Sequence, residues 1–162
     1  MKNLIASHTS NIFLKPGEVV MAYKPSLVSS VLGSCVAVTM FSRALKIGAI
    51  CHAMLPDSGG RSDDLRYVDN ALLNIFQKMR ETGAEELVVK LFGGAQVLNV
   101  GSYASEKRTV GEQNVARAEL VLAELGLKVA ARDTGGVQGR KLYFCTGSGD
   151  VFLHRMGQKL YL

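Results

Sequence analysis

The sequence predicts a mixed α/β sandwich, a single domain over residues 1–162 with mostly antiparallel or mixed sheets and two main helices. Three observations lead to this fold class. Short runs rich in β-branched and small residues recur along the chain, as they do in strands. Two longer segments carry apolar residues at helical spacing. Most of the early runs are joined by short turns, which favours antiparallel pairing between them.

The first third of the chain is expected to form strands. Residues 11–22, NIFLKPGEVVMA, give two short strands around a Lys-Pro-Gly turn signal. Residues 28–41, VSSVLGSCVAVTMF, predict a strand that is interrupted near Gly33, and residues 46–55, KIGAICHAML, predict a second extended run. These two runs flank the short segment SRAL, so we expect them to form a hairpin.

The rest of the chain alternates helices with strands. Ser62 is a suitable N-cap for the first helix, and Gly83 is a natural end for it. Between them, apolar residues recur at helical spacing: Leu65, Val68, Leu72, Ile75, Phe76 and Met79. A second amphipathic helix is expected over residues 110–126. The strands expected in this half are residues 86–94 and 127–136, followed by a hairpin over residues 141–156 about Gly147–Gly149.

Composition and charge narrow the function classes. The three cysteines, an odd number without a CxxC pair, argue against a disulfide scaffold and a structural zinc site and favour a reducing cytoplasm. No apolar run reaches the roughly 18 residues of a membrane span, so no membrane insertion is expected. The net charge is +5, but the basic residues are scattered and Trp is absent, so nucleic acid is not expected as a partner. A mildly basic protein instead suits an acidic protein partner, because opposite fields speed their encounter.

Cys35 and His52 are the candidate catalytic pair. If the hairpin is centred between Arg43 and Ala44, the two residues lie directly opposite each other on one face, with Cβ atoms roughly 5 Å apart. A thiolate attacks only when it is deprotonated, and a neighbouring imidazole can take the proton. A register slip of one residue would place the pair on opposite faces. Taken alone, Cys35 fits an inert packing residue better than a nucleophile, because free cysteines are commonly buried and inert.

The other two cysteines and two serines near Cys35 are the remaining candidates for the site. Cys51 precedes His52, so alternation along the strand directs its side chain to the other face, and Cys145 is also expected to pack in a strand. A third group should orient the imidazole. Ser29 and Ser30 are the nearby hydroxyls in sequence, although plain strand-end polarity explains them at least as well. The glycine pairs lack the lysine or the GxGxxG context of a phosphate-binding loop, so no nucleotide cofactor is expected.

Four motifs, in their order and spacing, resemble the CheD family of chemoreceptor glutamine deamidases. They are LGSCVAV (32–38), HAMLP with DSGG (52–60), KLFGGA (90–95) and DTGG (133–136). The resemblance extends over about residues 10–155. It implies an α/β sandwich similar to toxin-type cysteine deamidases, which converts selected glutamines on the cytoplasmic helices of methyl-accepting chemotaxis receptors to glutamates. It also implies a CheC-type phosphatase as a partner in some bacteria.

Within this resemblance, Cys35 is the nucleophile and His52 the general base and acid. The third residue of the family is a Thr six positions before the Cys, where this chain has Ser29, which keeps the hydroxyl and loses a methyl group. Ser30 is the second candidate for that role. The implied mechanism passes through a thioester and requires neither a metal nor an organic cofactor.

Other functions remain open at this point. The alternative is a non-catalytic adaptor that binds receptors or a CheC-type phosphatase while its cysteine site is idle, and a general cysteine protease or amidase is a third interpretation. The stretch SEKRT (105–109) is either a solvated loop or a contact for an acidic receptor helix.

Overall fold

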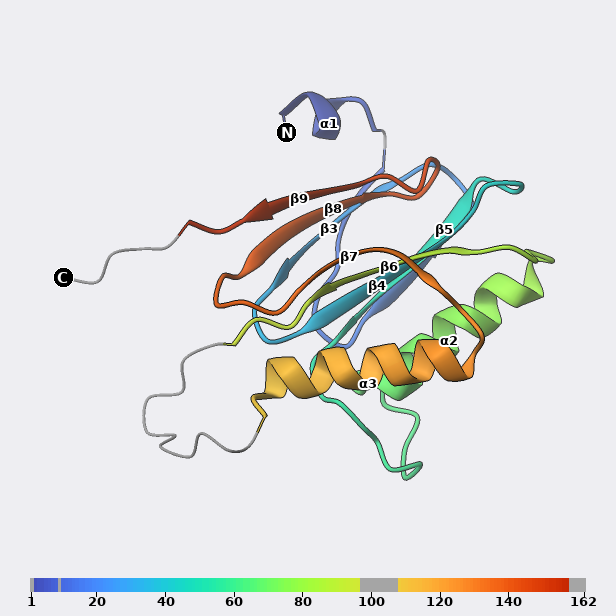
Figure 1. The fold of residues 1–162 in the computed structure, drawn as a ribbon. Helices are drawn as coiled ribbons and strands as arrows, with labels where there is room; N and C mark the ends of the chain where they lie inside the picture. Colours follow the sequence, from blue (N-terminus) through green and yellow to red (C-terminus); the bar gives the residue numbers. More distant parts are fainter. Residues whose placement is uncertain (1, 9, 97–107, 158–162) are drawn as a thin grey trace.

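The computed structural model describes residues 2–8, 10–96 and 108–157. Its elements form three layers, a small sheet, a large sheet and a pair of helices (Figure 1). The four-stranded sheet has the order β1-β3-β8-β9, and the five-stranded sheet has the order β2-β5-β4-β6-β7. The strands are β1 (Asn11–Phe13), β2 (Val19–Ala22), β3 (Leu27–Leu32), β4 (Val36–Ser42), β5 (Ile47–Ala53), β6 (Val88–Gly93), β7 (Val129–Thr134), β8 (Arg140–Cys145) and β9 (Val151–Arg155). The helices are α1 (Lys2–Ala6), α2 (Val68–Glu81) and α3 (Val110–Glu124).

Two apolar cores separate the three layers. Val36, Val38 and Met40 of β4 pack with residues of α2 and α3 in the core between the large sheet and the helices. Ala37 of β4 packs with Phe144 of β8 in the core between the two sheets. Because β4 and β5 have a layer on each face, they are buried along their whole length. This explains why both strands read as nearly continuous apolar runs rather than as alternating ones.

The predicted fold class is confirmed, and most strands and both main helices lie close to their expected bounds. Two strand pairs are parallel, β1 with β3 and β6 with β7. The start of α2 was predicted wrongly, because Tyr67 rather than Ser62 is its N-cap. The Ser62 hydroxyl instead accepts a hydrogen bond from the Asp64 N–H, which holds a local turn ahead of the helix. The short helix α1 was not predicted. Most of the stretch SEKRT lies outside the described residues.

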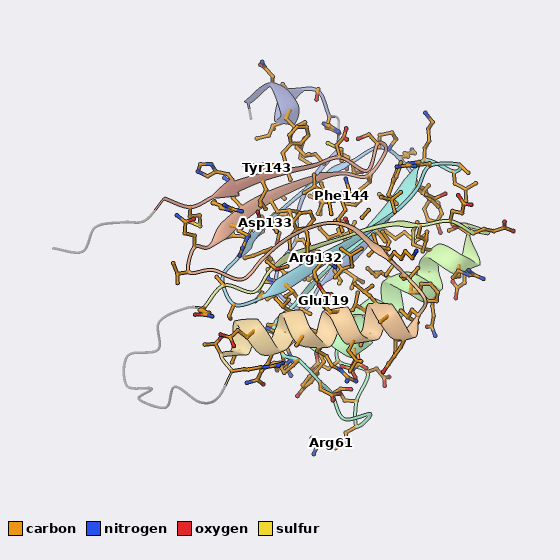
Figure 2. The ribbon with its side chains drawn as sticks, in the orientation of Figure 1. Arg61, Glu119, Arg132, Asp133, Tyr143 and Phe144 are labelled. Atoms are coloured by element: carbon orange, nitrogen blue, oxygen red, sulfur yellow. The ribbon has the colours of Figure 1, made fainter. Side chains whose placement is uncertain are left out.

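The outer face of the small sheet carries a row of side chains that includes Ser29, one of the candidate site residues. Phe13, Ser29, Tyr143 and Phe152 are successive cross-strand partners, one from each strand of this sheet. Tyr143 and its neighbour Phe144 leave β8 on opposite faces (Figure 2), and Phe144 is fully buried between the sheets. The side chain of Ser29 therefore belongs to the face that points away from the large sheet.

Candidate active site

Cys35 and His52 lie at the same end of the large sheet, where β4 begins and β5 ends. Cys35 lies in the connection just before β4 and is partly exposed, whereas His52 lies on β5 and is only 1% exposed. The residue directly opposite His52 is Ala37, so the predicted direct pairing with Cys35 is wrong by two positions. Cys35 nevertheless packs against the same core between the sheets as Ala37. The two candidate residues are therefore on one face, in a diagonal relationship.

The turn between β4 and β5 explains the shift in register. Ser42 pairs with Ile47, so the loop spans residues 43–46 rather than being centred between Arg43 and Ala44. The Ser42 hydroxyl accepts a hydrogen bond from the Leu45 N–H, and Lys46 has a φ of 53°. A shift by two residues preserves the face on which each side chain lies, whereas a shift by one would have reversed it.

Ser30, and not Ser29, contacts the imidazole. The Ser30 hydroxyl is fully buried and lies 2.7 Å from His52 Nδ1. The same hydroxyl donates a hydrogen bond of 2.7 Å to the carbonyl oxygen of Leu14. Ser29 follows the opposite alternation along β3 and lies in the outer row with Phe13. Of the two hydroxyls considered from the sequence, the structure brings only that of Ser30 to His52.

This pair of hydrogen bonds determines which ring nitrogen of His52 carries the proton. A carbonyl oxygen can only accept, so the single hydroxyl proton of Ser30 is directed to Leu14. Ser30 Oγ must then accept from His52, which places a proton on Nδ1 and leaves a lone pair on Nε2. Nε2 is buried and has no hydrogen-bond partner among the described residues. The imidazole is thus held in the form that can accept a proton at Nε2.

The backbone of His52 is held by the segment that crosses from the small sheet to the large one. Its N–H donates to the carbonyl oxygen of Glu18 at 3.1 Å, and its carbonyl oxygen accepts from the N–H of Gly17 at 2.8 Å. Leu14, at the start of the same crossing segment, supplies the acceptor for Ser30. Residues 14–18 therefore fix His52 through both its main chain and its side-chain partner.

The resting protonation state of the pair follows from burial. Burial lowers the pKa of His52 below its ordinary value, although the Leu14 carbonyl and the Glu18 carboxylate act in the opposite direction. Burial also raises the pKa of the Cys35 thiol. Both groups are therefore neutral near pH 7. No hydrogen bond joins Cys35 to His52 here, and such bonds commonly tighten only when substrate is bound.

Asn114 of α3, which no sequence motif indicated, ties together the segments that carry Cys35 and His52. Its side chain is fully buried, and Nδ2 donates to the carbonyl oxygen of Ser34 at 3.0 Å and to that of Met54 at 3.1 Å. Ser34 directly precedes Cys35, and Met54 directly follows β5. One amide thus fixes the turn that carries Cys35 against the end of the strand that carries His52.

The end of β6 approaches Cys35 closely. Gly93 has a φ of 90°, and a Cβ atom added to it would lie 2.3 Å from the carbonyl oxygen of Cys35. The N–H of Gly94 donates to this same carbonyl at 3.3 Å, and the N–H of Ala95 donates to the carbonyl of Gly33 at 2.8 Å. Gly93 and Gly94 are therefore in direct contact with the turn that carries Cys35.

The other two cysteines are placed as packing residues. Cys51 is buried in the core on the helix side of the large sheet, and burial raises its pKa to about 12. Burial also raises the pKa of Cys145, with a smaller contribution from Asp150 in the same direction. Burial raises the pKa of all three thiols, but Cys35 is the one that is partly exposed and therefore accessible to an external reactant.

Residues 2–8, 10–96 and 108–157 contain no group of three or more His, Cys, Asp or Glu side chains arranged to hold a metal ion. Among the helices of the same residues, none has both the length and the apolar character that crossing a bilayer requires.

Comparisons with known proteins place the chain among chemotaxis proteins. The CheD family model, described as CheD chemotactic sensory transduction, matches residues 54–155. A probable chemoreceptor glutamine deamidase CheD 2 of Geobacter sulfurreducens is 48% identical over 150 residues, which cover 91% of each chain. A probable chemoreceptor glutamine deamidase CheD of Maridesulfovibrio salexigens is 41% identical over 168 residues, which cover 96% of this chain and 97% of the relative. The chemoreceptor glutamine deamidase CheD of Thermotoga maritima is 34% identical over 145 residues.

Proposed function

Because this chain belongs to the CheD family, we propose that it hydrolyses the side-chain amide of specific glutamines in chemotaxis receptors, giving glutamate and ammonia. The names of its relatives supply the substrate class. The observation that carries the chemistry is the hydrogen bond from His52 Nδ1 to Ser30. It leaves the lone pair of Nε2 unpaired, at the end of the sheet where Cys35 lies.

In the first half of the reaction, Cys35 Sγ attacks the carbon of the glutamine carboxamide. His52 Nε2 takes the thiol proton as the S–C bond forms, and the carbonyl electron pair moves onto oxygen. The backbone N–H of Cys35 forms no hydrogen bond with other described residues and is a candidate donor to this oxyanion. The imidazolium then gives its proton to the amide nitrogen, the C–N bond breaks, ammonia leaves and a thioester remains.

In the second half, water replaces the thiolate. His52 Nε2 takes a proton from water as the oxygen attacks the thioester carbon. The C–S bond breaks, the thiolate recovers its proton from the imidazolium, and glutamate is released. Ser30 holds Nδ1 through both halves, and Asn114 keeps the cysteine turn in place. The neutral resting pair suits this cycle, because the base is already unprotonated before substrate binds.

The test is a conversion assay with the purified protein and a cytoplasmic receptor fragment from the same genome. Peptide mass spectrometry locates each glutamine that becomes glutamate. Cys35→Ala should abolish conversion, whereas Cys145→Ala, which removes a thiol at a packing position, should retain it. This control shows whether the loss of conversion is specific to Cys35 or follows the removal of any cysteine.

Two outcomes would change the proposal. Conversion that survives in Cys35→Ala would remove the cysteine from the mechanism. Absence of conversion by the unaltered protein, with binding to the receptor fragment intact, would favour the adaptor function. A CheC-type phosphatase as a further partner stays a prediction, which mixing the two purified proteins would test.

A further inference from the structure

A second feature lies at the same end of the molecule as Cys35. A surface pocket of about 190 Å³ is lined by residues 134–138, at the end of β7 and in the turn to β8, together with Arg140 and Arg155. Arg140 and Arg155 are direct cross-strand partners on β8 and β9. Nothing in the deamidation mechanism above uses this pocket, although the turn contains part of the DTGG motif.

Hydrogen bonds connect the pocket to the cysteine turn through one short segment, residues 93–96. On one side of this segment, Gly94 and Ala95 donate to the carbonyls of Cys35 and Gly33. On the other side, the Gly93 carbonyl accepts from the Gly135 N–H at 3.3 Å, and the Gln96 N–H donates to the Gly136 carbonyl at 2.7 Å. The two turns are thus bound to opposite sides of the same strand end. Figure 1 shows the β7–β8 turn and the β3–β4 connection at the same end of the molecule.

The pocket carries a surplus of positive charge. Arg140 is almost fully buried and donates to Asp133 Oδ1 at 2.7 Å and to the Gly135 carbonyl at 2.7 Å. Arg155, which is largely exposed, also contacts Asp133. Burial acts to raise the pKa of Asp133, but the hydrogen bonds from Arg155 and Arg140 outweigh it and hold that pKa below its ordinary value. Two guanidinium groups therefore share one ionised carboxylate, which leaves one positive charge beside the pocket.

The roles of the two arginines differ. Arg140 holds the turn closed, because its donors are directed to Asp133 and to carbonyl oxygens of the turn itself. Arg155 donates only to Asp133 among the described residues, and the two protons on its other terminal nitrogen remain available. The backbone N–H groups of Val137 and Gln138 likewise form no hydrogen bond within the described part of the chain. Free guanidinium and backbone N–H donors in one concave site match the geometry of a carboxylate.

We propose that this pocket binds an acidic side chain of the substrate protein, at a position near the glutamine to be deamidated. The inference rests on the proposed function for the identity of the reaction, but the carboxylate site itself does not depend on it. Arg155 is the specificity-determining residue, and Arg140 is its structural support. The pocket thus selects glutamines that have an Asp or Glu neighbour on the exposed surface of the substrate.

The first experiment measures steady-state deamidation of the receptor fragment by Arg155→Glu and Arg155→Gln. We expect KM to rise roughly tenfold in the charge reversal and less in the neutral variant, with kcat little changed, because a partly exposed charge-assisted contact is lost. Arg132→Gln is the matched control. Arg132 also lies on the sheet surface in an ion pair, with Glu119 (Figure 2), but it does not line the pocket. This control should behave like the unaltered protein.

The second step uses the mapped glutamine to find the acidic partner. Each Asp or Glu within two helical turns of that glutamine is changed to Lys in the receptor fragment. One of these substituted fragments should have a raised KM with the unaltered protein. With Arg155→Glu, the same fragment should return KM toward the value of the original pair, because Lys then faces Glu. The inference is wrong if each substituted fragment has the same KM with the unaltered protein and with Arg155→Glu. It is also wrong if Arg155→Glu keeps the original KM for the unaltered fragment.

A binding measurement separates failure of this inference from failure of the proposed function. Amide resonances of the nitrogen-15-labelled protein are followed during titration with N-acetylglutamate amide and, as the neutral control, N-acetylglutamine amide. The acid should shift the resonances of Val137 and Gln138, the amide should not, and Arg155→Glu should abolish the difference. Equal shifts with both compounds would overturn the carboxylate site, whether or not the receptor fragment is deamidated.

Discussion

Replacing Ser30 by Ala tests whether this hydroxyl, rather than that of Ser29, orients His52. The Ser30 hydroxyl lies 2.7 Å from the Leu14 carbonyl oxygen and 2.7 Å from His52 Nδ1. Its removal leaves a buried N–H and a buried carbonyl without their partner, at a cost of about 1–3 kcal/mol each in the free energy of unfolding. We therefore expect Ser30→Ala to unfold at a lower temperature than the unaltered protein.

The expected effect on catalysis follows from the proton on the ring. Without Ser30, the proton on Nδ1 loses the hydroxyl acceptor that favours it over Nε2, the atom that receives the thiol proton in the proposed mechanism. The lost hydrogen bond contributes about 1–1.5 kcal/mol, and a factor of ten in rate corresponds to about 1.4 kcal/mol, so kcat should fall roughly tenfold. KM should change little, because the Ser30 side chain is fully buried and does not reach the substrate.

The assay compares kcat, KM and the nitrogen-15 shifts of the His52 ring in Ser30→Ala, Ser30→Thr and Ser29→Ala. The Thr variant keeps the hydroxyl and should recover part of the lost kcat. The matched control is Ser29→Ala, which removes the neighbouring hydroxyl from the outer face of the small sheet and should keep the original kcat. A tenfold loss in Ser29→Ala with Ser30→Ala unaffected would refute the assignment and return the role to Ser29.

Three further predictions concern pH, the Asn114 amide and the glycine at the end of β6. Because burial lowers the pKa of His52 and raises that of Cys35, kcat/KM should fall as pH drops through the lowered pKa; an acid midpoint above about pH 6.5 would contradict this. Asn114→Leu should lower both kcat and the melting temperature, since the carbonyls of Ser34 and Met54 lose a shared donor at about 1–3 kcal/mol each. Steady-state kinetics and calorimetry measure the two effects. An unchanged kcat would exclude a positioning role for Asn114. Gly93→Ala should lose most activity, because the new Cβ would lie 2.3 Å from the Cys35 carbonyl oxygen. Gly83 also has a positive φ but has open space around it, so Gly83→Ala should lose stability and keep its activity. Equal activity in the two variants would show that the close approach of Gly93 to Cys35 is unimportant.

Much of the fold could be predicted from local pattern. The runs that became β4 and β5 are apolar, β-branched and bounded by turns, and both main helices have clear apolar spacing. The register of the hairpin could not be predicted, because Lys46 adopts a positive φ without the glycine that would have marked the turn. The N-cap of α2 was missed because Tyr67 makes no capping hydrogen bond, while Ser62 uses its hydroxyl in the preceding loop.

The residues of the candidate site could be predicted only in part, because some of their contacts depend on the tertiary structure. Both faces of β3 carry apolar residues, so alternation alone does not show whether Ser29 or Ser30 points inward. Asn114 reaches the carbonyl of Ser34 across a separation of 80 residues, and Arg155 meets Asp133 across 22. Contacts of this kind depend on how the layers stack, and no local spacing in the sequence encodes them.

The crossing segment, residues 14–18, sets a lower limit on any shortened form of the chain. The family match begins only at residue 54, and a fragment trimmed to residues 54–155 would contain neither Cys35 nor His52. A fragment that starts after residue 22 would keep both, yet it would leave the His52 main chain without its two partners and Ser30 without its acceptor. Such a fragment should still react with an alkylating reagent at its cysteine but should not turn over substrate. The crossing segment, which contributes no reacting atom, is thus expected to decide whether a fragment of this protein turns over substrate or only reacts at its cysteine.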